Sequence, residues 1–319
     1  ISANVRFALT GTPVENRLSE LWSMFDFLMP GFLYSYRKFR ERYELPIVKN
    51  QDPEALTALR RMTGPFVLRR LKKDVLRELP GKEERIVYSA ASGRQQKLYT
   101  ASALKLKEAL AGGAWSGNGK LEVLSQLMRL RQICCDPALC FEDYTGESAK
   151  LETCVSLIAS ASAAGHKILL FSQFASMLER IRERLLQEGI SSHLLVGATP
   201  KEERSRMVQA FASDEVPVFL ISLKAGGTGL NLTAADIVIH YDPWWNVAAQ
   251  NQATDRAYRI GQEKPVTVYK LILKDTIEEN LLKLQNAKLA LAAQVVSEGM
   301  VSLGDLSQNE LMELFEQNP

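Results

Sequence analysis

The sequence has few cysteines, few histidines and no long apolar run, and each of these absences excludes a class of protein. The four cysteines, Cys134, Cys135, Cys140 and Cys154, have spacings that fit no paired pattern of a structural zinc site. We interpret them as small buried residues in a reducing compartment, which predicts an intracellular protein. The three histidines are too scattered for a metal site. Because no segment reaches roughly 18 uninterrupted apolar residues and no secretory signal occurs, we expect no membrane span.

A strong excess of charge of one sign is also missing. The formal net charge is +2 over 319 residues, so a nucleic-acid surface would have to come from local clustering. The densest basic cluster lies in residues 69–77. It could follow a duplex backbone, although a solvated face is the commoner meaning of such a run. The chain opens at Ile1, inside a strand-like run, and we expect a fragment that lacks its natural start.

The pattern of apolar residues changes along the chain, whose length fits roughly two domains. Helical patterns occupy residues 18–28, 34–43, 53–62, 69–79, 95–110 and 121–133, and strand-like runs occupy residues 5–9 and 84–89. From residue 151 onward, predicted strands (167–171, 192–196, 218–221, 237–241 and 266–273) alternate with predicted helices (151–163, 175–188, 201–211 and 248–258). This alternation predicts a parallel sheet with helices on both faces, followed by a long amphipathic helix over 276–296.

The most informative segment begins with a glycine cluster behind a predicted strand. Gly226, Gly227 and Gly229 could bring backbone N–H groups close to a phosphate, and Thr228 could add a hydroxyl. Tight-turn chemistry explains such a triplet about equally well. The functional interpretation gains weight because ligands bind at the carboxyl ends of parallel strands. Near the start of the chain, Thr10 could relay between a nucleotide and a nucleic-acid groove, although a plain turn is the simpler explanation.

Two arginines, Arg256 and Arg259, are predicted to share one face of a helix farther along this segment. Guanidinium groups bind phosphate oxygens in a planar, bidentate way and stabilise charge during phosphoryl transfer. The alternative is a solvated helix face on which they pair with Asp255. Just before this helix, one of Trp244 and Trp245 could anchor the core while the other stacks on a base. A purely structural role for both is equally open.

With these segments the chain resembles the SWI/SNF-type ATPases of helicase superfamily two. The segments similar to that family's motifs III, IV and IVa are 9–16 (LTGTPVEN), 167–174 (KILLFSQF) and 197–199 (GAT). Those similar to motif V, to the tract before motif VI and to motif VI are 222–233 (SLKAGGTGLNLT), 242–246 (DPWWN) and 252–262 (QATDRAYRIGQ). Residues 66–82 (FVLRRLKKDVLRELPGK) are also typical of the family, so the resemblance covers nearly the whole chain.

The resemblance implies an α/β fold, with a RecA-like parallel sheet, helices on both faces, helical insertions and a C-terminal brace helix. It implies two RecA-like lobes, with ATP in the cleft between them and duplex DNA across them. Residues 1–92 are then expected to end the first lobe with its helical insertion, and 93–160 to form a helical insertion and the entry to the second lobe. Residues 161–275 are expected to form the second RecA-like lobe, and 276–319 a C-terminal helical extension.

The resemblance also implies an ATP-dependent translocase or remodelling ATPase that moves on duplex DNA. Its catalytic residues would be the arginine fingers Arg256 and Arg259, and its ATP-binding residues Gly227, Gly229, Gln252 and Asp255. Its DNA-binding residues would be Thr10, Ser172, Gln173, Gly197, Lys224, Thr228, Asn231 and Trp245. ATP and Mg²⁺ would be held mainly by an upstream lobe, with no metal ligands in this chain. A monomeric motor is expected, in the cytoplasm, nucleoid or nucleus, with a DNA-bound protein as a further partner.

The chain departs from the family pattern at several points. Val247 stands where the family usually has proline, Gln250 near where it has an acidic residue, and Asp136 where many relatives have histidine. No GxxxxGK[ST] loop and no DExx pair after a strand is present, so nothing holds the β- and γ-phosphates or the metal. We therefore expect this chain to hydrolyse no ATP alone. Two other functions stay open: a non-catalytic DNA- or protein-binding module, against which the two arginines weigh, and a strand-separating helicase.

Overall fold

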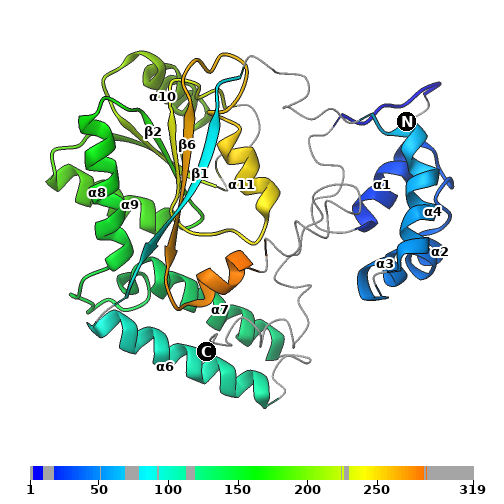
Figure 1. Cartoon of the computed structure of the whole chain (residues 1–319), viewed down its shortest axis with the longest axis horizontal. Helices are drawn as coiled ribbons and strands as arrows, with labels where there is room; N and C mark the ends of the chain where they lie inside the picture. The colour runs from blue at the N-terminus through cyan, green and yellow to red at the C-terminus, as the bar shows by residue number, and fades with distance from the viewer. Residues whose placement is uncertain are drawn as a thin grey trace. The chain divides into compact units, whose positions relative to one another are not determined.

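The computed structural model describes residues 3–9, 18–50, 52–68, 79–91, 93–112, 119–223, 225, 230–283 and 285. The chain forms two compact units (Figure 1). The first is made largely of residues up to 77, and the second largely of residues 78–244 and 249–283. The contacts within the chain place the boundary between the two units after residue 77, whereas the sequence placed it after residue 92. The assignment of the two units to two lobes stays a prediction.

The second unit is built on a six-stranded sheet in which all neighbouring strands are parallel. The strands are β1 (Lys82–Ser89), β2 (Ile168–Ser172), β3 (Ser192–Leu195), β4 (Val218–Ser222), β5 (Ile237–His240) and β6 (Val266–Leu273). They lie in the order β1-β6-β5-β2-β4-β3. Every residue of β2, β4 and β5 is buried, as short apolar runs in a sheet covered on both faces must be. The predicted parallel sheet is confirmed.

Helices cover both faces of this sheet (Figure 1). They are α8 (Ala149–Ala163) and α9 (Ala175–Gln187) on one face, and α10 (Lys201–Ser213) and α11 (Val247–Thr254) on the other. Successive side chains of a strand point to opposite faces. Ile168 and Leu170 of β2 therefore join the core under α8 and α9, whereas Leu169 and Phe171 join the core under α10 and α11.

Helices α8 and α9 end in the same way, at glycines that adopt a left-handed backbone conformation. Gly165 has a φ of 80° and Gly189 a φ of 74°. In each case the next residue's N–H bonds back five positions, from His166 to Ala161 and from Ile190 to Leu185. This is the Schellman arrangement, which satisfies carbonyls that the helix end leaves unpaired. It turns the chain sharply into β2 and toward β3.

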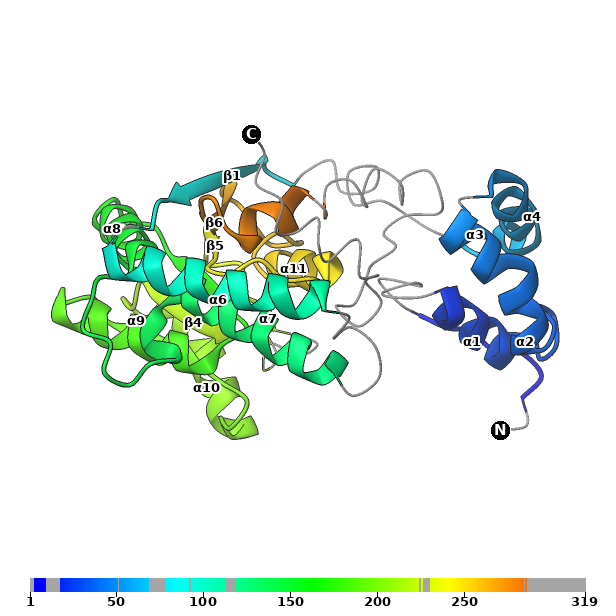
Figure 2. The same cartoon turned by 90° about the horizontal axis from the view of Figure 1, so that it is seen from below.

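Two further helices, α6 (Gly93–Ala111) and α7 (Gly119–Cys135), lie across the end of the sheet toward which the strands point (Figures 1 and 2). Hydrogen bonds fix them there. The Tyr99 hydroxyl of α6 accepts a bond of 2.7 Å from the N–H of Ile277, just after β6. Arg131 of α7 bonds to Gln173, just after β2. The carboxyl ends of β2 and β6 therefore face a helical layer.

The first unit is a small helical body with its own core. Its elements are α1 (Leu18–Leu28), α2 (Tyr36–Phe39), a π-helical turn (Arg40–Glu44), α3 (Leu45–Asn50), α4 (Pro53–Thr63) and a 3-10 turn (Gly64–Phe66). The core includes Leu21, Phe25 and Phe39. Helix α4 begins where the carboxylate of Asp52 accepts the N–H groups of Glu54 and Ala55, with proline at the first helical position.

Some predicted elements differ from the structure. Residues 5–9 form no strand: Val5, Phe7 and Leu9 are exposed, and the described chain pairs no strand with them. Most of the predicted basic helix over 69–79 lies outside the described residues, as does most of the helix predicted from Thr276, which is helical at 277–283. The described residues hold no helix long and apolar enough to cross a membrane, and no cluster of potential metal ligands.

Candidate functional site

The sheet has a topological switch point between β2 and β5. The connection that leaves β2 runs through α9 to β3 on one side, whereas the connection that leaves β5 runs through α11 to β6 on the other. Such divergence places a crevice at the carboxyl ends of the two strands, where α/β proteins bind ligands. The residues at this point are Ser172, which ends β2, Gln173, which follows it, and Tyr241 and Asp242, which follow β5.

Asp242 ties these two strand ends together. One oxygen of its carboxylate accepts the Ser172 hydroxyl at 2.5 Å and the backbone N–H of Gln173 at 3.2 Å. The carboxylate is completely buried. Burial raises its pKa, and the opposing pull of Arg131 and of the Ser172 hydroxyl keeps that rise in check. Asp242 thus has a structural role, and the hydroxyl of Ser172, which was predicted to contact DNA, is bonded to it inside the protein.

Arg131 bridges these two strand ends. Its guanidinium donates to the side-chain oxygen of Gln173 at 2.9 Å and to the carbonyl of Pro243 at 2.6 Å, and it lies 3.5 Å from Asp242. Its side chain is only 2% exposed. Sequence reasoning missed this residue because a single arginine in a helical pattern usually faces solvent. Its position was the available signal, since Leu127, Arg131 and Cys134 follow the spacing of the buried face of α7.

The two predicted arginine fingers do not share a helix face. Helix α11 ends at Thr254, and the chain continues in turns through both arginines. The carbonyl of Arg256 accepts the N–H of Leu232 at 3.1 Å. In a continuing helix, this carbonyl would instead accept the N–H of the residue four positions later. Arg256 is buried, at 7% exposure, whereas Arg259 is exposed. The shared-face prediction is therefore wrong, although both residues lie in one turn.

The electrostatics around Arg256 favour an anion. Burial lowers the pKa of its guanidinium, and the neighbouring Arg259 lowers it further. Within the part of the chain that the structure describes, its Nε atom is buried and has no hydrogen-bond partner. A buried cation with an open donor beside a second cation is destabilised until negative charge arrives. Phosphate oxygens, which accept planar arginine hydrogen bonds, would supply that charge.

The remaining predicted site residues differ in exposure. Gln252, Asn231 and Gly197 are exposed, and Asn231 precedes the residue that bonds to the carbonyl of Arg256. Asp255 is half-buried, and Trp245 is buried, which favours the anchoring role over base stacking. Thr10, Lys224, Gly227, Thr228 and Gly229 lie outside the described residues.

Comparison with known proteins identifies the family. The model of the SNF2-related domain matches residues 1–139, and that of the helicase conserved C-terminal domain matches residues 149–261. The Bacillus subtilis protein YwqA, named as a helicase/translocase, is 43% identical over 97% of this chain and 34% of its own length. The solved Sulfolobus solfataricus SWI2/SNF2 ATPase C-terminal domain is 31% identical, with a TM-score of 0.61, over 75% of this chain and all of that one. The chain belongs to the SWI2/SNF2 family of ATPases.

The longer Sulfolobus SWI2/SNF2 ATPase core, solved in complex with double-stranded DNA, is 36% identical with a TM-score of 0.64. That match covers 98% of this chain and 67% of the core. The RecA-like α/β fold predicted from the resemblance is confirmed. The chain spans about a third of the length of the curated relatives it matches.

The structure accounts for two departures of this SWI2/SNF2 chain from the family pattern. Asp136 caps the 3-10 turn η3 (Pro137–Leu139) by accepting the N–H of Ala138 at 2.9 Å, and it pairs with Arg180 at 2.8 Å. Gln250 is buried, and its side-chain oxygen accepts the N–H of Trp244 at 3.4 Å. Both residues therefore fix loop geometry. Nothing in the structure explains Val247, the first residue of α11.

Proposed function

We propose that this chain supplies the arginine-bearing half of an ATP-driven motor that translocates along duplex DNA. The observation that carries the proposal is Arg256, a buried guanidinium with an open donor, next to the second cation Arg259. A passive DNA-binding or protein-docking module gains nothing from burying such a group, because a buried donor without a hydrogen-bond partner costs stability. A motor gains a preorganised site for the charge that develops during phosphoryl transfer.

The residues present fit one side of an ATP site. Arg256 and Arg259 would bind phosphate oxygens. The glycine segment 226–229 lies shortly before Leu232, whose N–H bonds to the carbonyl of Arg256. Bound ATP would supply the phosphoanhydride bond whose hydrolysis drives movement. The described residues include no group of carboxylates suited to Mg²⁺, so we assign the metal to other parts of the intact protein.

Duplex DNA is the proposed track. Gln173 follows β2, Gly197 follows β3 and Asn231 lies in the connection after β4, so all three belong to the carboxyl-end side of the sheet. Gly197 and Asn231 are exposed, and no atom lies within 4 Å of the place a side chain would occupy at Gly197. A backbone could therefore approach a DNA phosphate closely there. The complex of the Sulfolobus core with DNA supports this choice of track.

The absence of a GxxxxGK[ST] loop bears on activity. Such a loop cradles the β- and γ-phosphates of bound nucleotides. We propose that an ATP-holding lobe elsewhere in the intact protein provides it, that the arginines of this chain act on ATP held there, and that this chain alone turns over no ATP.

The test is DNA-stimulated ATP hydrolysis by the intact protein carrying Arg256→Ala. We expect turnover to fall about a thousandfold, the scale seen when an arginine finger is removed. Arg182→Ala, which removes an exposed arginine of α9, is the matched control and should behave like the wild type. Normal turnover of Arg256→Ala would refute the assignment. A strand-separation assay on the same protein should be negative, and unwinding would favour the helicase alternative.

A further inference from the structure

Arg131 joins two loops that carry different parts of the proposed function. The β2 loop, residues 173–174, contains Gln173, a predicted DNA contact. The β5 loop, residues 241–244, leads into α11 and on to Arg256. The guanidinium of Arg131 donates to Gln173 in the first loop and to Pro243 in the second. Its carbon also lies 5.7 Å from the ring centre of Phe174.

The geometry of this contact requires an arginine. A guanidinium is a planar fork whose donors point in fixed directions, so one group can bridge two acceptors on separate loops. A lysine ammonium carries the same charge but is a compact point, and it cannot span both acceptors. If the cation served only to balance Asp242, either residue would be adequate. The two short bonds to Gln173 and Pro243 therefore indicate a role beyond neutralising charge.

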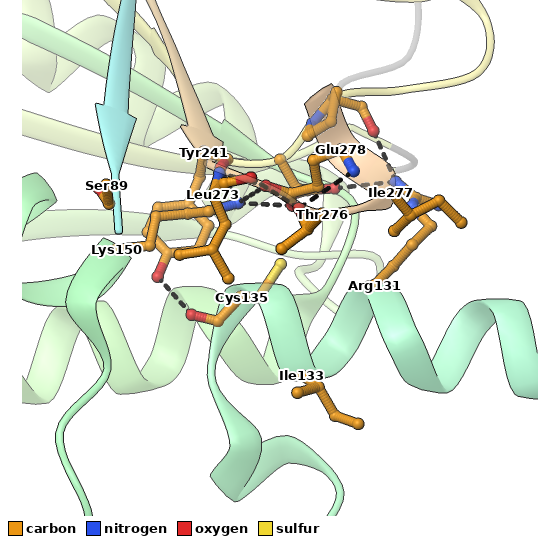
Figure 3. A network of polar contacts seen from close by, with 12 residues as sticks. Ser89, Arg131, Ile133, Cys135, Lys150, Tyr241, Leu273, Thr276, Ile277 and Glu278 are labelled. Atoms are coloured by element: carbon orange, nitrogen blue, oxygen red, sulfur yellow. Dashed lines mark hydrogen bonds and ion pairs between the residues drawn. The ribbon is translucent and has the colours of Figure 1, made fainter. Parts of the chain in front are cut away.

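A second buried ion pair fixes the other end of the β5 loop. The ammonium of Lys150, in α8, donates to the carbonyl of Tyr241 at 3.3 Å and to the carboxylate of Glu278 at 2.5 Å. Both side chains are at most 1% exposed. Figure 3 shows Lys150, Tyr241 and Glu278 gathered at the strand ends beside α7. With the start of the β5 loop held by Lys150, two links join this loop to the β2 loop: Asp242, which bonds to Ser172 and to the backbone of Gln173, and Arg131, which bonds to the side chain of Gln173 and to Pro243.

We propose that Arg131 is a positioning residue that couples duplex DNA at Gln173 to the placement of Arg256. This inference rests on the proposed function and names the connection that the function requires. When DNA binds Gln173 and displaces its side chain, the guanidinium of Arg131 moves with it. Because the same guanidinium bonds to Pro243, the movement reaches the chain that leads to α11. Arg131 is itself buried, so its role is to hold Gln173 and Pro243 in place and not to bind DNA or ATP directly.

The test is Arg131→Lys in the intact protein. The variant keeps a positive charge against Asp242, so it avoids the penalty of an unpaired buried carboxylate. The expected result is a melting temperature within a few degrees of the wild type and a roughly tenfold fall in the ratio of ATP turnover with saturating DNA to turnover without DNA. The KM for ATP should stay unchanged, because displacement of Arg256 affects the reacting state more than substrate binding. Arg180→Lys, at the pair with Asp136, is the matched control.

An unchanged turnover ratio in folded Arg131→Lys overturns the proposal. If that variant does not fold, Gln173→Met removes the acceptor from a half-buried position. At saturating DNA it should lower the ratio in the same way, and a wild-type ratio contradicts the coupling. If the wild-type intact protein shows no DNA stimulation, the proposed function fails. The role of Arg131 in positioning the two loops is then tested by hydrogen exchange of backbone amides in the 319-residue chain. Arg131→Lys should speed exchange at Gln173 and Trp244, and unchanged exchange rates would refute the role.

Discussion

The pair Lys150–Glu278 makes a quantitative prediction about stability. Burial lowers the pKa of Lys150, but the charge and hydrogen bond of Glu278, with the nearby Cys135 and Cys134, together outweigh that effect and raise the pKa, so the lysine stays charged. Burial also raises the pKa of Glu278, against the pull of Lys150. Glu278→Met leaves this cation buried without its partner. Breaking a buried pair on one side costs about 3–5 kcal/mol. Glu278 also accepts the N–H of Leu273 at 2.9 Å, and leaving that donor unsatisfied adds about 1 kcal/mol or more.

Replacing both residues should be far less harmful. In Lys150→Met/Glu278→Met no buried charge remains, and apolar side chains of similar volume fill the space, which is often neutral or stabilising. Thermal unfolding followed by circular dichroism measures the difference. At about 2–4 °C per kcal/mol, a loss of about 4–6 kcal/mol predicts that Glu278→Met melts roughly 8–24 °C below the wild type. The double variant should recover most of that loss. A double variant as unstable as the single one would refute the reasoning.

Two further predictions concern the sheet and the helix ends. Burial, together with nearby Lys270 and Lys82, lowers the pKa of His240 to about 3. Between about pH 6.5 and pH 3 the unfolded state therefore binds a proton on this residue that the folded state does not, and stability decreases as the pH is lowered. Urea unfolding of the wild type should lose about 2 kcal/mol more than His240→Gln between pH 6.5 and 5, and equal losses would contradict the shift. Gly165→Ala should cost about 1–2 kcal/mol, because its φ is 80° and nothing crowds a side chain there. Gly81→Ala, at a site that is equally open but has an ordinary backbone conformation, should change stability little. If both variants lost the same free energy of unfolding in urea, the left-handed conformation of Gly165 would not explain its loss.

The parallel sheet could be predicted from the sequence because its signal is local. The runs that form β2, β4 and β5 are short, apolar and separated by helical patterns, and each stands as a buried strand. The failure at residues 5–9 has a simple cause. A strand needs a neighbour to pair with, and the described chain offers none, so apolar alternation alone could not form one.

The candidate site was harder to predict because its decisive contacts are long-range. Arg131 and Asp242 lie 111 residues apart in the chain, and Lys150 and Glu278 lie 128 apart. The helical spacing of Arg131 places it on the buried face of α7, but it does not identify the partner of the guanidinium. The end of α11 was missed for the same reason, since Leu232 rather than a helical neighbour bonds to the carbonyl of Arg256. Arg256 was singled out because its motif is specific, and its catalytic role stays a prediction, although the predicted helix face was wrong.

The most direct test of the central claim is ATP turnover by the 319-residue chain and by the intact protein, each with and without duplex DNA. The account predicts that the chain alone hydrolyses no ATP and that the intact protein responds to DNA, because the arginines act on ATP held elsewhere. Hydrolysis by the chain alone would contradict this account and would require a second phosphate site within it.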